Sequence, residues 1–252
     1  TAATGEADIR DRVTAMLAEI EAGGDQRAAA FARELDGFQG EIVVSPEAMA
    51  QAITEVPQRQ KDDIRFAHDN VRRFAEAQRA AISDVDMEVM PGLVAGHRNI
   101  PLEVAGCYVP GGRYAHVASA IMSVTTAKVA GVTTIVACSP PRGAAGIPPA
   151  VLYALDLCGA DRVLTLGGVQ GVAALAFGLF GGRPADILVG PGNQFVAEAK
   201  RLLYGRVAID MFAGPTESLV IADKAADAEI VRSVGRKKAL ELFERVRIPS
   251  PE

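Results

Sequence analysis

Apolar residues recur at helical spacing through the first third of the chain. Two stripes repeat at steps of three and four residues, one formed by Ile9, Val13, Met16, Leu17 and Ile20 and the other by Ile64, Ala67, Val71 and Phe74. Ser45 is followed by Pro46 and Glu47, a helix-start signal in which serine caps the first turn and proline fits its first position. The pattern predicts a helical arm over residues 5–80.

The pattern changes after residue 85. The stretch "DMEVMPGLVAGHRNIPLE" (86–103) is typical of a hairpin or strand pair. Beyond it, four apolar runs alternate with helical segments: "VAGCYV" (104–109), "TTIVAC" (133–138), "RVLTL" (162–166) and "DILVG" (186–190). Near-continuous Val, Ile and Leu runs joined by helices are typical of parallel strands that are covered on both faces.

These runs predict an α/β fold: an open, doubly wound, mostly parallel Rossmann-like sheet with an N-terminal helical arm. We expect three regions. Residues 1–99 form the arm and connector, residues 100–231 the Rossmann-like core, and residues 232–252 a short C-terminal helical tail.

Composition narrows the choice of partners. The chain has 252 residues, of which 49% are hydrophobic, and a formal net charge of −5, which argues against a nucleic-acid or anionic-membrane surface. No apolar run reaches the ~18 residues of a membrane-spanning helix. Cys107, Cys138 and Cys158 have no CxxC spacing, which argues against a disulfide framework or a structural zinc cluster. We expect a cytoplasmic protein that binds a small molecule.

Candidate chemistry lies in three turns that follow predicted strands: "YVPGGRYAH" (108–116), "LGGVQG" (166–171) and "VGPGNQF" (189–195). In doubly wound sheets, ligands bind beyond the carboxyl ends of the strands. Glycines there let a ligand approach the backbone, and the following helix offers free N–H groups to a phosphate. None of the turns is a GxGxxG fingerprint, and each alone is also explained as a tight turn. Gln170 and Asn193 add amides suited to a cofactor, although Asn193 also suits a helix cap.

Four longer stretches carry a resemblance to a known family. "IPLEVAGCYVPGG", "LGGVQGVAALAFG", "DILVGPGNQFVAEAKR" and "AIDMFAGPTESLVIAD" resemble the successive motifs of the histidinol dehydrogenase family, whose members are zinc- and NAD-dependent alcohol oxidisers. The similarity runs from about Ile9 to about Val231. Within the family, "GGRYAHVASAIMSVTTAKVAGV" is similar to the sulfopropanediol dehydrogenase branch.

The resemblance implies roles for individual residues. Tyr108, Gln170 and Asn193 take the positions that contact NAD in the family, and Thr216, followed by Glu217, takes a substrate-site position. It further implies an enzyme that oxidises 2,3-dihydroxypropane-1-sulfonate to 3-sulfolactate. The alternatives are an L-histidinol dehydrogenase and, in another class, a non-catalytic nucleotide-binding or assembly module.

A polar cluster bears on the substrate. Arg113, Tyr114 and His116 directly follow the paired glycines of the first turn. Arginine and histidine form charge-assisted hydrogen bonds with an anion such as a sulfonate, and tyrosine adds a donor. An exposed turn that is merely polar is the alternative interpretation.

The chain departs from the family after "IADKAADAEIV" (221–231). The family continues there into zinc ligands and a catalytic Glu-His pair, whereas this chain passes into "RSVGRKKALELFERVRIPSPE". The three histidines, His68, His97 and His116, have no metal-ligand spacing. We therefore assign no catalytic base and no metal ligand. Zinc is expected in the full-length family enzyme, this chain is expected to be incomplete and inactive as given, and a homodimer is expected.

Overall fold

A five-stranded parallel sheet forms the centre of the structure, which is a computed structural model that describes residues 2–112 and 115–211. The strands are β3 (Val104–Tyr108), β4 (Thr134–Cys138), β5 (Arg162–Leu164), β6 (Ile187–Val189) and β7 (Ala208–Ile209). Their order is β5-β4-β3-β6-β7, and every neighbouring pair is parallel. The chain therefore builds outward from β3 to β5 and then returns to the other side of β3. This reversal makes the sheet doubly wound, as predicted, and places the topological switch point between β3 and β6.

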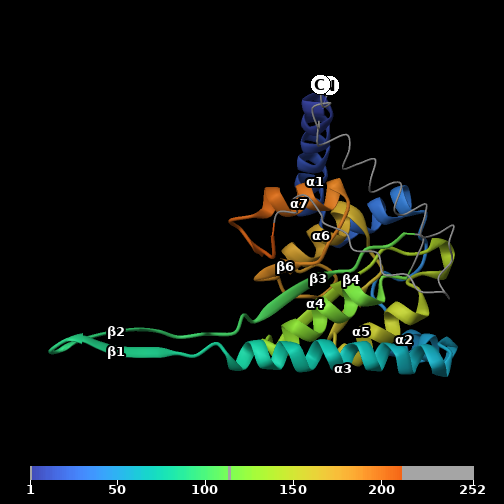
Figure 1. The fold of residues 1–252 in the computed structure, drawn as a ribbon. Coiled ribbons are helices and arrows are strands. Elements are labelled where there is room, and N and C mark those ends of the chain that lie inside the picture. The colour runs from blue at the N-terminus through green and yellow to red at the C-terminus, as the bar shows by residue number, and fades with distance from the viewer. Residues whose placement is uncertain (1, 113–114, 212–252) are drawn as a thin grey trace, which may run out of the picture. The chain divides into compact units, whose positions relative to one another are not determined.

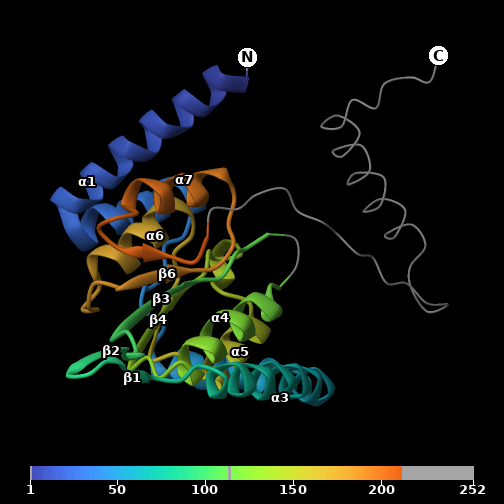
Figure 2. The ribbon, with the colours of Figure 1, turned by 60° about the vertical axis from the view of Figure 1, so that its left-hand side comes forward.

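Helices cover both faces of the sheet (Figures 1 and 2). One layer contains α1 (Ala2–Asp36), α6 (Gly168–Phe177) and α7 (Gln194–Leu203), which contact one another. The other contains α2 (Pro46–Glu55), α3 (Gln58–Ala80), α4 (Val117–Val129) and α5 (Pro149–Cys158). A short 3₁₀ helix, η1 (Gly143–Ala145), precedes α5. All five residues of β3 are buried, because side chains on both of its faces meet a helix layer.

The predicted helical arm is α1, α2 and α3. Helix α1 is broken at Gly24, whose φ of 56° is incompatible with a continuous helix. The Ser45 hydroxyl caps α2 by accepting a hydrogen bond from the Ala48 N–H at 3.1 Å, as its sequence context indicated. Val13 and Ile20 of α1 lie in the same apolar cluster as Leu164 of the sheet. The predicted boundary at residue 99, between the arm with its connector and the core, stays a prediction.

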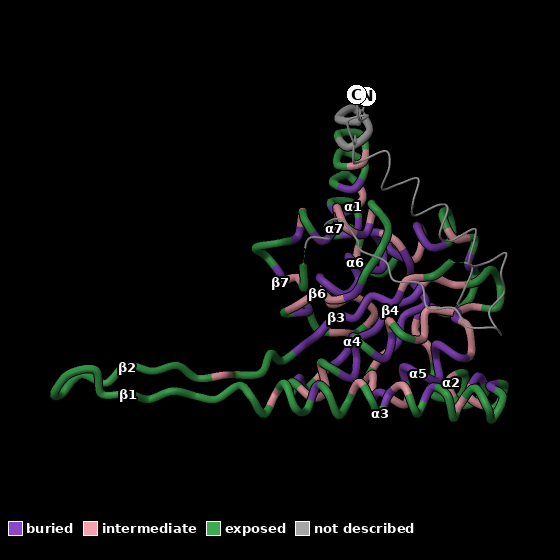
Figure 3. The backbone as a smooth tube through the Cα atoms, in the orientation of Figure 1, coloured by how far each residue is buried: buried purple, intermediate pink, exposed green. Residues whose placement is uncertain are grey.

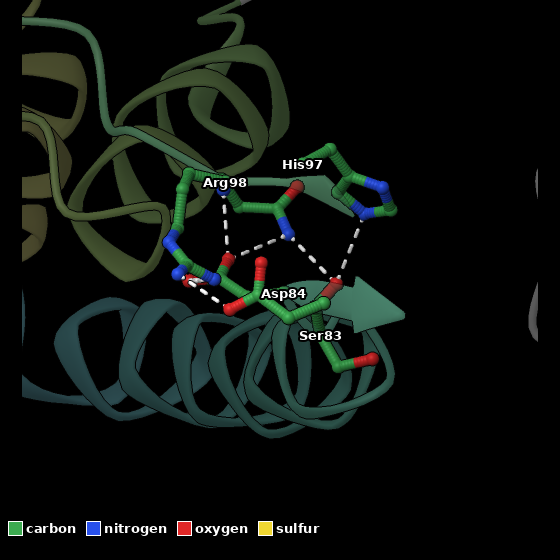
Figure 4. Close-up of polar contacts among 6 residues, drawn as sticks. Ser83, Asp84, His97 and Arg98 are labelled. Atoms are coloured by element: carbon green, nitrogen blue, oxygen red, sulfur yellow. Dashed lines mark hydrogen bonds and ion pairs between the residues drawn. The ribbon is translucent and has the colours of Figure 1, made fainter. Parts of the chain in front are cut away.

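Residues 85–97 form an exposed antiparallel hairpin, in agreement with the strand pair expected there. Its strands are β1 (Val85–Met90) and β2 (Leu93–His97), and every residue of both is exposed (Figure 3). Polar contacts fix its stem (Figure 4). Asn99 donates from its backbone N–H to the Asp84 carboxylate at 2.8 Å and from its side chain to the Ser83 carbonyl at 3.0 Å. The hairpin is thus held by polar contacts at its base, and both of its strands are exposed to solvent along their length.

Some predictions concern residues beyond the described ranges. The chain divides into two compact units, residues 1–212 and 213–252, and all described residues lie in the first. The predicted tail at 232–252 and the boundary at 231 lie outside the described residues. Strand β7 was not predicted, because two residues are too short to produce a periodic signal. No helix in the described part of the chain is long and apolar enough to cross a membrane.

Candidate cofactor pocket

A pocket of about 420 Å³ lies at the carboxyl edge of the sheet. Tyr108 reaches it from the end of β3, Gln170 from the first turn of α6 and Asn193 from the turn after β6. The structure therefore brings together three candidate cofactor residues that come from three separate turns of the sequence. The rest of the wall is formed by Arg12, Met16, Leu35, Asp36, Pro110, Gly111, Gly112, Pro140, Gly168, Val169 and Phe195.

Tyr108 links two of the turns. Its phenol oxygen accepts a hydrogen bond from the Gly168 N–H at 3.0 Å, and only 5% of the residue is exposed. Burial, the largest cause, raises the pKa of the phenol above its ordinary value. The group therefore stays protonated at neutral pH. Because its oxygen is the acceptor toward Gly168, its own proton is available to a ligand in the pocket.

Gln170 is held by the N-terminal arm. The residue is 1% exposed, and its Nε2 donates to the Asp36 carboxylate at 2.9 Å, across 134 residues of sequence. Burial raises the pKa of Asp36, and the hydrogen bond from Gln170 partly offsets this effect. Among the described residues, no donor reaches the buried Oε1 atom of Gln170. A buried acceptor without a partner is rare in native proteins and calls for an explanation.

Asn193 is a helix cap, as one interpretation of the sequence expected. Its Oδ1 accepts hydrogen bonds from the N–H groups of Phe195 at 3.0 Å and Val196 at 3.1 Å. The cap occupies the oxygen and leaves the amide NH₂ group, for which the described residues offer no acceptor. Capping and cofactor binding are therefore compatible at this position, since they use opposite ends of the amide.

The arm adds residues that sequence reasoning missed. Arg12 of α1 lies over the Phe195 ring, with 5.4 Å between the guanidinium carbon and the ring centroid, and both residues line the pocket. Asp36 and Arg12 are the two charged residues of the described wall. No motif identified them, because they reach the pocket only when α1 packs on α6 and α7.

A second feature that was missed is an ion pair beneath the turn after β6, in which the cation is buried and the carboxylate partly buried. Lys200 of α7 is 6% exposed, and its ammonium group contacts the Asp210 carboxylate and donates to the Gly190 carbonyl at 3.0 Å. Asp210 in turn accepts from the Gly190 N–H at 2.8 Å. Gly190 has a φ of 117°, and a Cβ there would overlap the Tyr108 carbonyl oxygen. The pair thus fixes both polar groups of Gly190, three residues before Asn193.

The predicted substrate residues are described only in part. His116 lies at the start of α4 and lines a smaller hollow of about 200 Å³, which shares Pro110, Gly111, Gly112 and Pro140 with the cofactor pocket. Arg142 lines the same hollow and donates to the Gly112 carbonyl at 3.1 Å. Arg142 was not among the residues predicted from the sequence. Arg113, Tyr114 and Thr216 lie outside the described residues.

The described residues do not fit a zinc site. They contain no group of three His, Cys, Asp or Glu side chains that could hold a metal ion. His68 is buried on α3 beside Asp69, and His97 lies in the hairpin 3.2 Å from the Ser83 carbonyl. All three cysteines are unpaired and buried, and burial raises the thiol pKa to about 12 at Cys107 and about 11 at Cys158. Such thiols stay protonated and are poor metal ligands.

Known proteins resemble this chain over most of its length. The sequence pattern of the family described as "Histidinol dehydrogenase" matches residues 1–233. A sulfopropanediol 3-dehydrogenase from Ruegeria pomeroyi is 60% identical over 231 residues, which are 92% of this chain and 53% of that protein. A histidinol dehydrogenase homolog from the same organism is 64% identical over 222 residues, 88% of this chain and 51% of that protein.

A solved structure is also similar. The crystal structure of histidinol dehydrogenase from Elizabethkingia anophelis superposes with a TM-score of 0.80 at 31% sequence identity, and the match covers 92% of this chain and 53% of that one. The chain spans about half the length of the relatives that it matches.

Proposed function

Because this chain belongs to the histidinol dehydrogenase family, we propose that it binds NAD at the carboxyl edge of its sheet and is part of an enzyme that oxidises a small alcohol. One observation carries the proposal. Tyr108, Gln170 and Asn193 come from three turns and line one pocket at the switch point of a doubly wound sheet. That is the usual position of a nucleotide in such folds.

The pocket offers the interactions that a dinucleotide needs. The N-terminal ends of α6 and α7 lie at its wall, where the positive end of a helix dipole favours a phosphate. Tyr108 and Asn193 offer donors, and Gln170 offers an acceptor. Phe195 and Met16 supply apolar surface for a ring. These chemical groups together favour a nucleotide over a purely apolar ligand.

We propose that the alcohol is anionic, and that sulfopropanediol fits better than histidinol. Support comes from the 60% identity to a sulfopropanediol 3-dehydrogenase, against 38–39% to histidinol dehydrogenases. His116 and Arg142 in the adjoining hollow supply groups that bind a sulfonate, and the sequence adds Arg113 and Tyr114, with Thr216 as a further substrate contact. A cationic amine such as that of histidinol would be repelled there.

The proposed reaction converts the primary alcohol of 2,3-dihydroxypropane-1-sulfonate into the carboxylate of 3-sulfolactate. Two NAD molecules each accept a hydride, and one water supplies the second carboxylate oxygen. Zinc, where a full-length family enzyme holds it, would acidify the alcohol. The described residues contain no fitting site, so we derive no step through the metal. NADH formation measured on sulfopropanediol and on histidinol tests the substrate, and a preference for histidinol would reverse this assignment.

We also propose a homodimer, in the cytoplasm, in which the hairpin meets a second copy of the chain. Met87, Val89, Leu93 and Val94 are exposed on β1 and β2. A two-stranded hairpin is marginally stable alone in water and gains stability when its side chains are covered. An apolar groove of about 610 Å³ at its base is lined by Ile82, Ile100, Leu102, Ile187 and Val189, among others. A two-fold partner would place its own hairpin against this surface.

Asn193→Ala tests the cofactor proposal. The change should weaken NAD binding about tenfold, because it removes the amide donor. It should also cost about 1 kcal/mol of stability through the lost cap of α7. Isothermal titration calorimetry with NAD measures the first effect, and urea denaturation measures the second.

Ser45→Ala is the matched control. It removes the cap of α2, which is remote from the pocket, and should cause a similar loss of stability with unchanged NAD affinity. NAD affinity that is equal in Asn193→Ala and wild type would remove Asn193 from the site.

A further inference from the structure

Two acceptor atoms lie together in the cofactor pocket. Gln170 must direct its NH₂ group at Asp36, because a carboxylate only accepts hydrogen bonds. This contact fixes the orientation of the amide and leaves Oε1 of Gln170 as an acceptor. Asp36 uses its Oδ2 atom for Gln170, and among the described residues no donor reaches its Oδ1 atom. The pair therefore presents two acceptor atoms, Oε1 of Gln170 and Oδ1 of Asp36.

The backbone leaves room beside the Gln170 oxygen. Gly168 has a φ of 53°, and a Cβ built there would lie 3.1 Å from Oε1 of Gln170. Any side chain at this position would crowd the oxygen. Because glycine stands there, no side chain crowds the oxygen, which is buried in the wall of the pocket that Gly168, Gln170 and Asp36 all line.

The ligand group that fits two acceptors is one with two neighbouring donors. A ribose with free 2′ and 3′ hydroxyls meets this requirement. A ribose with a 2′-phosphate does not, because the phosphate replaces one donor by acceptors and carries negative charge toward the Asp36 carboxylate. Carboxylates in dinucleotide-binding folds commonly accept the ribose 2′-hydroxyl in this way.

We propose that Asp36 and Gln170 bind the adenosine ribose of the cofactor through its free hydroxyls, so that the N-terminal arm selects NAD over NADP. The inference rests on the proposed function, since it refines how the same pocket recognises its ligand. It assigns to α1 a role in specificity. Arg12, the other charged residue of the described wall, lies over Phe195 and 3.9 Å from the Asp8 carboxylate.

The test compares the affinities of NAD and NADP by calorimetry. Wild type should bind NAD roughly tenfold to a hundredfold more tightly than NADP, the range expected for one charge-assisted hydrogen bond. Asp36→Asn keeps an acceptor for Gln170 and removes the charge, and it should reduce the preference by about tenfold, chiefly through tighter NADP binding. Glu34→Gln removes a carboxylate from the same helix, one that pairs with Arg27 and does not line the pocket, and it should leave the preference unchanged.

A second measurement does not depend on any variant. Wild type should bind NAD with a 2′-deoxyadenosine ribose about tenfold more weakly than NAD itself, because one donor is missing. If wild type binds neither NAD nor NADP, the proposed function fails and this inference with it. If NAD binds but NADP or the deoxy analogue binds equally well, or if Asp36→Asn folds and retains the full preference, only this inference is overturned.

Discussion

The two hollows beside β3 and β6 differ in chemistry more than in size. The larger, of about 610 Å³, lies at the base of the hairpin and is lined mainly by aliphatic side chains such as Ile100 and Ile187. The smaller, of about 420 Å³, lies at the carboxyl edge and contains a buried amide, a carboxylate and a phenol. The larger volume adjoins exposed apolar surface, whereas the smaller contains an unpartnered acceptor. Chemistry rather than volume therefore marks the smaller hollow as the candidate site for a nucleotide.

The difference between the two hollows follows from how the two helix layers cover the faces of the sheet. Leu188 of β6 faces the layer of α1, α6 and α7 and is 2% exposed, while Ile187 and Val189 face the other side and are only half-buried. On that side, α4 packs mainly on β3 and β4, and its Ser123, Thr126 and Ala127 line the groove together with Ile187 and Val189. An apolar face of this kind favours a protein partner, whereas converging polar groups favour a small ligand.

The largest expected effect is at the turn that supports the cofactor pocket. Gly190→Ala should lower the free energy of unfolding by at least about 3 kcal/mol, because the new Cβ would overlap the Tyr108 carbonyl and the φ is unfavourable. Urea denaturation measures the loss.

Gly205→Ala is the control for that change. Gly205 has a φ of 99° but open space around its Cβ position, so only the conformational cost of about 1 kcal/mol applies. Equal losses in the two variants would mean that the close approach to Tyr108 does not constrain the pocket.

The next effect is at the ion pair beneath the turn after β6. Lys200→Met should cost about 2–3 kcal/mol, because it leaves the partly buried Asp210 and the Gly190 carbonyl without their cation. Lys128→Met breaks a more exposed pair with Asp161 and should cost about 0–1 kcal/mol. The two variants, compared by chemical denaturation, separate a pair that supports the pocket from one on the surface. A Lys200→Met protein as stable as Lys128→Met would refute this distinction.

A smaller effect is expected at the hairpin. Val94→Glu should weaken the proposed dimer tenfold or more, because a two-fold interface buries the new charge twice. A concentration series by analytical ultracentrifugation measures the dissociation constant. Phe66→Glu changes an equally exposed residue in the first half of α3 and should leave the dimer intact. A monomeric wild type, or a Val94→Glu protein with unchanged association, would contradict the proposed interface.

Much of the fold was predictable from local patterns. The alternation of apolar runs and helical segments identified four strands of the sheet, and the glycine turns after them located its binding edge. Tyr108, Gln170 and Asn193 were proposed from those turns and from the family resemblance, and the structure places them around one pocket. Their roles toward NAD stay predictions.

Other features depend on contacts that no local pattern encodes. Asp36 meets Gln170 across 134 residues, and Lys200 meets Asp210 only after β7 has paired with β6. The exposure of the hairpin was equally hidden, because its alternating Val and Met residues are typical of a strand with one covered face. Periodicity identifies elements, whereas the partner of each face is decided by tertiary packing.

A crystal structure of the chain with NAD tests the central claim most directly. Our account predicts cofactor density in the pocket at the carboxyl edge, with polar contacts from Tyr108, Gln170 and Asn193 and the adenosine ribose hydroxyls at Asp36. Density in the groove beside the hairpin, with the pocket at Gln170 empty at saturating NAD, would contradict it.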